Sequence, residues 1–181
     1  MSMEQVRVTD GVDASADGEP GVTIDPQKLQ RHMETVRSEQ NFLMGITGGL
    51  LCAAIGAVLW AVITILTEYQ IGYMALGVGF LAGLGVKTLG RGVDPKFQYA
   101  GAVLALAGCL AGNLMVVIVF GSLQTGISIT TILSRLTPAV VVELYRATFN
   151  VMDLLFYGLA ITIGYRYSVR TISPEEIQKL A

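Results

Sequence analysis

The sequence has few of the residues that build catalytic or metal sites. It contains one histidine, His32, and two cysteines, Cys52 and Cys109, each of which lies in an apolar run. A lone histidine cannot assemble a histidine metal set or a serine or cysteine triad. Two isolated cysteines support neither a disulfide framework nor a cysteine zinc site. We therefore expect a protein that is not an enzyme and that uses no cofactor or metal.

Charged residues are also scarce. They make up 14% of the 181 residues, whereas 52% are hydrophobic, and an ordinary soluble domain carries roughly 25% charged residues. Residues 1–40 hold 12 of the 26 charges, so the remaining 141 residues are too apolar to cover a water-soluble core. The net charge of −2, without a basic cluster, makes nucleic acid a poor partner. The composition predicts a polar leader joined to a membrane domain.

The leader has two parts. Residues 1–24 are rich in Gly, Asp, Ser and Glu, which predicts a disordered acidic segment. Asp25 and Pro26 then give a capping residue followed by a proline at the first helical position. No further glycine or proline occurs before Gly45. We therefore expect a helix over 25–40 that is continuous with the first membrane span.

Four apolar segments are candidate spans, since about 20 apolar residues cross the hydrocarbon core of a bilayer. They lie at 42–66, 71–86, 97–120 and 151–168, within a membrane domain over 41–168. The last segment contains Asp153, which falls in the first turn of a helix that begins near Asn150, where the helix dipole favours a carboxylate. The sequence thus predicts an all-α integral membrane protein with four transmembrane helices.

The connections between spans predict an orientation. Lys87, Arg91 and Lys96 lie in the 87–96 loop, and lysine and arginine accumulate in short cytoplasmic loops. These side chains are also placed to contact anionic lipid headgroups. Both termini are then cytoplasmic, with a tail helix within 169–181. Arg135 and Arg146 on the opposite side oppose this assignment mildly.

The 121–149 connection allows more than one interpretation. GSLQTG at 121–126 is typical of a turn, and Pro138 precedes a segment with apolar residues near helical spacing. We expect 129–149 to form an interfacial amphipathic helix. A re-entrant or pore-lining element, or a further span, remains open.

Small residues recur every four positions in the apolar segments. Such stripes let helix backbones approach closely, and they predict tight helix packing. The partner helix belongs either to the same chain or to another copy. The packing positions are Gly45, Gly49 and Ala53 in the first span, Gly79 and Gly83 in the second, and Gly108 and Gly112 in the third.

Polar and aromatic side chains within the spans form a second group. Asn113 and Asp153 are candidates for an interhelical hydrogen bond or for a polar permeation path, since a polar group at membrane depth needs a partner or water. Several aromatic residues lie near predicted span ends, as an interfacial belt requires. They are among Trp60, Tyr69, Tyr73, Tyr99, Tyr157, Tyr165 and Tyr167.

Three stretches carry a resemblance. IGYMALGVGFLAGLGVKTLGRG, GAVLALAGCLAGN and DLLFYGLAITIGYRYS resemble segments of small uncharacterised bacterial multi-span inner-membrane proteins. The resemblance implies a bacterial cytoplasmic membrane and no assigned activity.

These observations predict a membrane component that acts through helix packing with copies of itself or with another membrane protein. The helix over 25–40 is its expected contact arm. The alternative is a small oligomeric channel or transporter for an ion or small solute, with Asn113 or Asp153 on its path.

Overall fold

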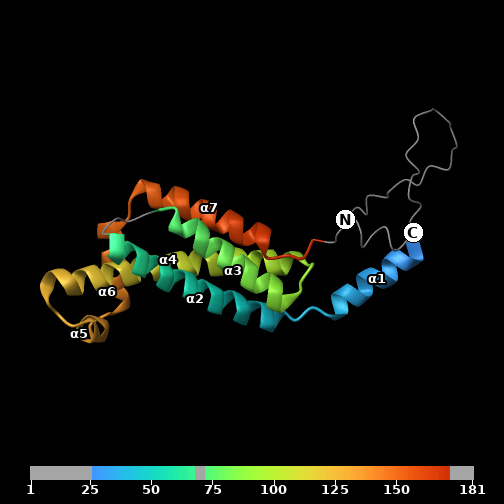
Figure 1. The fold of residues 1–181 in the computed structure, drawn as a ribbon, viewed down its shortest axis with the longest axis horizontal. Helices are drawn as coiled ribbons and strands as arrows, with labels where there is room; N and C mark the ends of the chain where they lie inside the picture. The colour runs from blue at the N-terminus through green and yellow to red at the C-terminus, as the bar shows by residue number, and fades with distance from the viewer. Residues whose placement is uncertain (1–25, 68–71, 172–181) are drawn as a thin grey trace, which may run out of the picture.

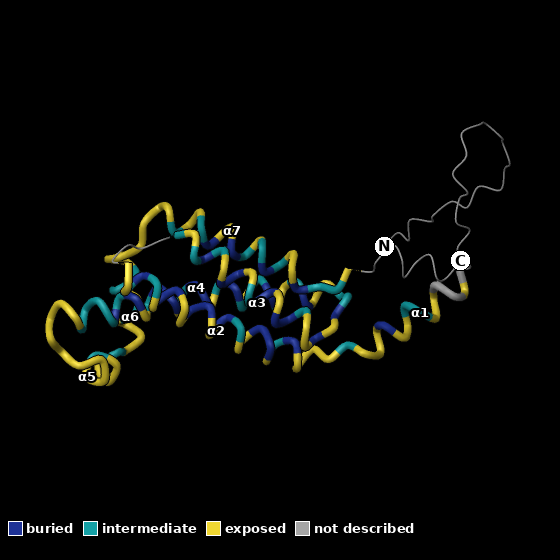
Figure 2. The backbone as a smooth tube through the Cα atoms, viewed as in Figure 1, coloured by how far each residue is buried: buried dark blue, intermediate teal, exposed yellow. Residues whose placement is uncertain are grey.

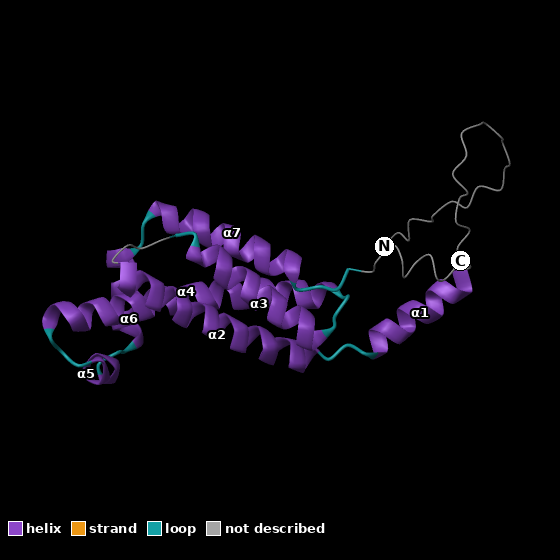
Figure 3. Ribbon diagram, in the orientation of Figure 1, coloured by secondary structure: helices purple, strands orange, loops and turns teal. Residues whose placement is uncertain are grey.

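The computed structural model describes residues 26–67 and 72–171, which form seven helices and no strand (Figures 1 and 3). The predicted all-α fold is therefore confirmed for this part of the chain. The leader at 1–24 and all but the first residues of the predicted tail helix at 169–181 lie outside the described residues. The helices are α1 (Pro26–Ser38), α2 (Phe42–Thr67), α3 (Met74–Gly90), α4 (Pro95–Thr125), α5 (Ile129–Ser134), α6 (Pro138–Thr148) and α7 (Val151–Tyr167).

Four apolar helices pack side by side as a bundle (Figure 1). α3 and α4 each contact α2 and α7, so α2 and α7 lie on either side of the α3–α4 pair. One end of the bundle contains the start of α2, the α3–α4 turn and the end of α7, because Gly45 faces Gly90 and Gly101 faces Ser168. The other end contains the starts of α3 and α7 together with α5 and α6.

The helices differ in length. α2 has 26 residues and α4 has 31, and both are long and apolar enough to cross a membrane. α3 and α7 have 17 residues each, which is about 26 Å at 1.5 Å per residue. α6 and α7 together meet the same test but are bent by 108°. Two helices, or three if the bent pair counts as one span, are therefore able to cross a membrane.

The bundle has small residues inside and large apolar residues outside (Figure 2). On α2, Ala53 and Ala57 are 3% and 1% exposed, whereas Leu51 and Ile55 are 58% and 56% exposed. A water-soluble protein buries its large apolar side chains. Small interior residues with leucine and isoleucine outside are instead typical of helices in lipid, so a membrane location is plausible.

The expectation that the amino-terminal helix continues into the first span is wrong. α1 ends at Ser38 and α2 begins at Phe42. Asn41 caps the new helix, because its Oδ1 accepts a hydrogen bond from the Met44 amide at 3.1 Å. Its own backbone N–H donates to the carbonyl oxygen of Gly90 at 3.1 Å. The Asn41 backbone N–H thus bonds to the end of α3, and not to a carbonyl oxygen one turn earlier as it would in a continuous helix.

The 121–149 connection forms two short helices rather than one. α4 continues to Thr125 and ends at Gly126, whose φ of 66° lies in the left-handed region that glycine adopts without strain. Ser128 caps α5, and Thr137 caps α6 ahead of Pro138. Neither helix contains a buried residue. The Tyr145 hydroxyl nevertheless anchors α6, since it donates to the Leu110 carbonyl oxygen of α4 at 2.5 Å.

Candidate functional site

A cluster of polar side chains lies inside the bundle near the end that carries α5 and α6. It consists of Trp60 and Thr64 from α2, Asn113 from α4 and Tyr157 from α7, all at most 5% exposed. Asn113 Nδ2 donates to the Tyr157 hydroxyl at 2.8 Å and so joins α4 to α7. Asn113 therefore forms an interhelical hydrogen bond, which is one of the two roles that the sequence predicts for it.

Three buried polar atoms of this cluster have no hydrogen-bond partner: Trp60 Nε1, Thr64 Oγ1 and Asn113 Oδ1. Thr47 and Thr162 donate to the carbonyl four residues earlier, at 2.9 and 2.8 Å, but Thr64 makes no such bond. Each unsatisfied buried group costs about 1–3 kcal/mol. Three such groups within one cluster therefore indicate a site that is not optimised for stability alone.

Two cavities border this cluster. The first, which we call the polar cleft, has a volume of about 190 Å³ and contains the side chain of Asp153. The second, which we call the apolar groove, has a volume of about 420 Å³ and follows the last turns of α4. The polar cleft is lined by Trp60, Gly72, Thr148, Asn150, Met152, Asp153 and Phe156. The apolar groove is lined by Thr64, Val116, Val117, Phe120, Gly121, Gln124 and Thr148. Thr148 borders both cavities.

Asp153 lies at the start of α7 in a capping box with Asn150. The Asn150 backbone N–H donates to Asp153 Oδ2 at 2.8 Å, while the Asn150 side chain accepts from the Asp153 amide. Among the described residues no basic side chain pairs with this carboxylate. The carboxylate therefore caps the start of α7 and also lines the polar cleft.

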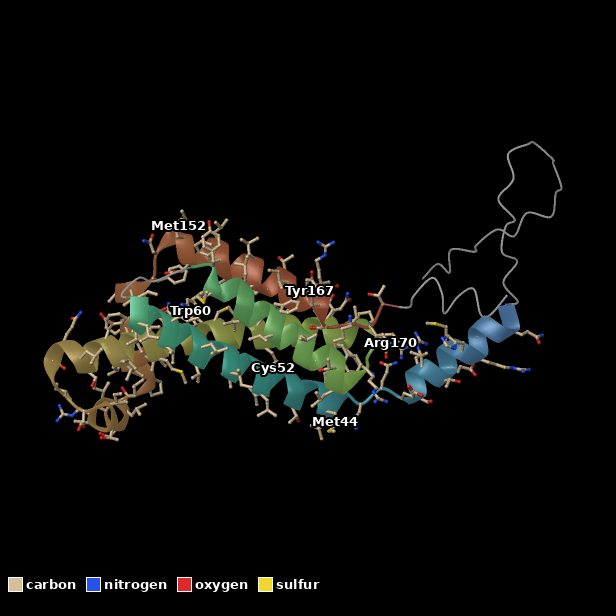
Figure 4. All side chains as sticks on the ribbon, viewed as in Figure 1. Met44, Cys52, Trp60, Met152, Tyr167 and Arg170 are labelled. Carbon is tan, nitrogen blue, oxygen red and sulfur yellow. The ribbon has the colours of Figure 1, made fainter. Side chains whose placement is uncertain are left out.

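The polar cleft is recessed below the ends of the two longest helices. Trp60 packs in one cluster with Ala75 near the start of α3, and it shares the cleft with Met152 at the start of α7. Figure 4 places Trp60 and Met152 toward the same end of the bundle, far from Met44 and Arg170. α2 continues seven residues beyond Trp60 to Thr67, about 10 Å at 1.5 Å per residue.

The small-residue stripes meet other helices of the same chain. A Cβ at Gly79 would lie 2.5 Å from the Ala160 carbonyl oxygen, and one at Gly108 would lie 3.1 Å from Ala53 Cβ. The structure places every member of the stripes against a neighbouring helix. The contacts are Gly45 with Gly90 and Phe97, Gly49 with Val86 and Leu104, Ala53 with Gly108, Gly79 with Ala160, Gly83 with Gly164 and Tyr167, and Gly112 with Ala57 and Trp60.

Basic residues gather at the opposite end, around the α3–α4 turn. Lys96 Nζ lies 3.2 Å from Asp94 Oδ2, and Arg37 Nε of α1 lies 3.5 Å from Asp94 Oδ1. Arg91 follows the last residue of α3 with a φ of 46°, and Lys87 is half-buried one turn before it. Asp94 therefore joins the basic turn to α1.

The aromatic residues that the sequence offers for an interfacial belt fall into two groups. Trp60 and Tyr157 belong to the buried polar cluster and are 2% and 5% exposed. Tyr73 and Tyr99, at 70% and 64%, are exposed as such a belt requires. The spacing of the small residues distinguishes the buried aromatic residues from the exposed ones. Trp60 lies on the inner face of α2, in helical register with Gly49, Ala53 and Gly56.

The described residues contain no group of three or more His, Cys, Asp or Glu side chains able to hold a metal ion. Comparisons with protein-family models, with curated proteins and with solved structures find no match to this chain. The function must therefore be argued from the site and the surface of the bundle.

Proposed function

We propose that this chain is a four-span, non-enzymatic component of the bacterial cytoplasmic membrane that works by packing against a second copy of itself. The four spans are α2, α3, α4 and α7. The inside-out distribution of apolar residues supports the membrane setting. α3 and α7 are short for a core of about 30 Å, but their packing against α2 and α4 supports their insertion at the same depth.

The orientation in this proposal follows the basic residues. Lys87, Arg91 and Lys96 lie at the end where α2 starts and α7 ends, and Arg166 and Arg170 belong to the same end. Basic residues in short loops favour the cytoplasmic side. The proposal therefore puts α1 in the cytoplasm and α5 with α6 at the outer surface as interfacial helices.

The contact face is a groove on the outside of α3 and α7, which is the observation that carries the proposal. The groove has a volume of about 600 Å³ and includes Gly77, Phe80 and Leu159. Gly77 and Gly158 have no atom within 4 Å of where a Cβ would lie. Gly79 faces Ala160 and Gly83 faces Gly164, an offset of 81 residues in both cases, so Gly77 is level with Gly158 on the parallel neighbour.

Gly77 lines the groove, and Gly158 lies at the same level on the exposed surface of α7. Such open glycines let another helix approach closely. The stripes inside the bundle are already occupied by the chain's own helices, whereas these two glycines leave space for a second copy. A two-fold axis beside α3 and α7 would place the same glycines of both copies in the interface, as a closed isologous dimer requires.

α1 supplies a further contact arm in this proposal. It projects from the bundle (Figure 1) and is joined to it through Asn41 and through the pair of Arg37 with Asp94. In this proposal the part of α1 that extends away from the bundle contacts a cytoplasmic partner.

Single-molecule photobleaching of labelled protein in liposomes at decreasing protein density tests the self-association. We expect dimers in the wild type and at least a tenfold weaker dimer in the Gly77→Ile/Gly158→Ile variant, whose added side chains enter open space within one copy. Ala54→Ile, on the exposed face of α2, is the matched control and should leave the dimer unchanged. A wild type that is monomeric at every density, or a double variant that dimerises normally, contradicts the proposal.

An oligomeric channel or transporter is the second candidate. The observation in its favour is the group of unpaired polar atoms at Trp60, Thr64 and Asn113 beside two cavities. Within one copy the interior below this group is closed by helix contacts such as Gly48 with Gly85. A path through the membrane would therefore have to run between copies.

A further inference from the structure

A groove lies on the outer surface of the bundle between the first turns of α2 and of α4, and we call it the α2–α4 groove. Its volume of about 440 Å³ falls within the range of about 300–1,000 Å³ that is typical of small-molecule sites. Lys96 is the one charged residue that lines it. The other lining residues are Phe42 and Ile46 of α2 and Tyr99, Ala100, Val103 and Leu104 of α4.

The charge lies at one end of this groove. Lys96 Nζ is 3.2 Å from Oδ2 of Asp94, the residue that precedes α4, so the ammonium group lies at the end of the bundle. That end is the one nearest α1, where Figure 4 labels Met44 of α2. Val103 and Leu104 lie seven and eight residues further along α4 than Lys96, about 10–12 Å deeper. The groove therefore has a cation at its mouth and apolar walls inside.

The mouth carries a net positive charge. Arg37 of α1 also contacts Asp94, with Nε 3.5 Å from Oδ1, so two cations share one carboxylate and the three side chains carry a charge of +1. The side chains of Arg37 and Lys96 are 65% and 53% exposed and can contact a ligand. Lys96 Nζ also lies 5.5 Å from the centroid of the Phe97 ring, which favours a fixed position for the ammonium group. An anion is the complementary ligand at the mouth.

The interior of the groove favours an acyl chain over a helix. Helices that associate in a membrane use stripes of small residues, but Ala100 is the only small residue that lines this groove. A charged group would lose its hydration among the apolar walls, so the anion has to stay at the mouth. The groove thus matches an amphiphile with an anionic head and an apolar tail.

We propose that the α2–α4 groove binds an anionic phospholipid, with its phosphate at Lys96 and Arg37 and an acyl chain along Ala100 and Val103. The inference rests on the proposed orientation, in which this end of the bundle is cytoplasmic. The head then lies at the cytoplasmic surface and the chain points into the membrane, as in a lipid of that leaflet. A zwitterionic lipid binds more weakly, because its ammonium group is repelled by the positive mouth.

Native mass spectrometry of the full-length protein in a neutral detergent tests this site. The protein is titrated with phosphatidylglycerol, with phosphatidylethanolamine that has the same acyl chains, and with glycerol phosphate, which has no acyl chain. We expect saturable binding of phosphatidylglycerol, at least tenfold weaker binding of phosphatidylethanolamine, and weaker binding still of glycerol phosphate. Added salt should weaken the binding of phosphatidylglycerol, because the charges at the mouth are exposed.

Three variants test the charge at the mouth. Lys96→Gln should weaken phosphatidylglycerol binding at least fivefold. Asp94→Asn raises the charge of the three side chains from +1 to +2 and should strengthen binding, while asparagine remains a good residue at the start of α4. Lys87→Gln is the matched control, because it removes the same charge from the same end of the bundle and Lys87 does not line the groove. It should bind phosphatidylglycerol within twofold of the wild type.

Two further variants test the acyl chain. Ala100→Phe fills the groove and should weaken the binding of both phospholipids, with the charges at the mouth unchanged. Ala54→Phe adds the same ring on the exposed face of α2, outside the groove, and should leave binding unchanged. Circular dichroism verifies that each variant keeps its helix content.

Equal binding of the two phospholipids overturns the proposal, as does a folded Lys96→Gln variant that binds phosphatidylglycerol normally. An equal loss of binding in Lys87→Gln and Lys96→Gln overturns the role of the groove, since it would mean a general attraction to the basic end. Glycerol phosphate that binds as tightly as the phospholipid overturns the acyl-chain contact. Ala100→Phe protein that binds lipid normally but no longer dimerises would mean that a second copy occupies the groove, which also overturns the proposal.

This outcome is separable from that of the proposed dimer. The α2–α4 groove shares no lining residue with the groove between α3 and α7. The Gly77→Ile/Gly158→Ile variant should therefore bind phosphatidylglycerol as the wild type does. A monomeric wild type that prefers phosphatidylglycerol contradicts the dimer alone, and a dimeric wild type without this preference contradicts the lipid site alone.

Discussion

Gly101 of α4 and Gly164 of α7 face each other so closely that neither position has room for a side chain. A Cβ at Gly101 would lie 2.5 Å from the Gly164 carbonyl oxygen, and one at Gly164 would lie 2.7 Å from the Gly101 carbonyl oxygen. Because the obstacle on each side is backbone, it cannot move without separating the two helices. The contact fixes α7 against the centre of the bundle at the end that carries the basic turn.

The first prediction follows from this contact. Gly164→Ala should lower the free energy of unfolding by about 1–3 kcal/mol, because the methyl group forces α7 away from α4. Gly158→Ala in the same helix adds a methyl group in open space and should be neutral or stabilising by up to about 1 kcal/mol. Unfolding in a graded sodium dodecyl sulfate titration, followed by circular dichroism, measures both. Equal destabilisation by the two substitutions would contradict the packing assigned to Gly164.

The sequence predicts the inner faces of the helices well. Hydropathy locates the apolar runs, since the run at 42–66 coincides with α2 at Phe42–Thr67. The period of four then separates Gly79, which is crowded, from Gly77, which is open. Both signals are local, because they depend on helix geometry and on the solvent that each face meets.

The polar cluster could not be predicted in the same way. Trp60 and Tyr157 are residue types that interfacial belts contain, and only their packing in one cluster with Ala75 and Val78 of α3 and Cys109 of α4 buries them. The break between α1 and α2 was also missed. It depends on the bond from Asn41 to Gly90, a residue far away in the sequence. Helix propensity depends on residues that are close in the sequence, so it gives no information about such long-range contacts.

The second prediction concerns the hydrogen bond between Asn113 and Tyr157. Asn113→Ala and Tyr157→Phe should each destabilise the bundle, and the double variant should cost less than the sum of the two. We expect a coupling free energy of about 0.5–2 kcal/mol, since interhelical hydrogen bonds in membranes have that size. The sodium dodecyl sulfate titration described above measures the unfolding free energy of the two single variants and of the double variant. A coupling free energy of zero would mean that the 2.8 Å contact contributes nothing to stability.

The third prediction concerns Arg91, which follows α3 with a φ of 46°. A residue with a Cβ pays about 1–2 kcal/mol in the left-handed region, and glycine does not. Arg91→Gly should therefore raise the unfolding free energy by about 0.5–1 kcal/mol, the remainder being lost to the greater freedom of the unfolded chain. Gly92→Ala is the contrasting variant and should destabilise the turn, because a Cβ at Gly92 would overlap the Phe97 ring at 2.0 Å. If Arg91→Gly unfolded at a lower detergent concentration than the wild type, the backbone strain assigned to Arg91 would be contradicted.

The fourth prediction separates the two candidate functions. Proteoliposomes that contain the wild type should show no flux of K⁺ or of small neutral solutes above that of protein-free vesicles, because the bundle interior is closed by backbone contacts. At Gly48 and Gly85 these contacts leave no space for a side chain, and Asn113 is held by Tyr157 rather than aligned along a channel. Stopped-flow fluorescence with K⁺-loaded and solute-loaded vesicles measures the rates. Flux that depends on protein density and that falls in Asn113→Ala or Asp153→Asn, with Glu143→Gln unchanged, would instead support a path between copies.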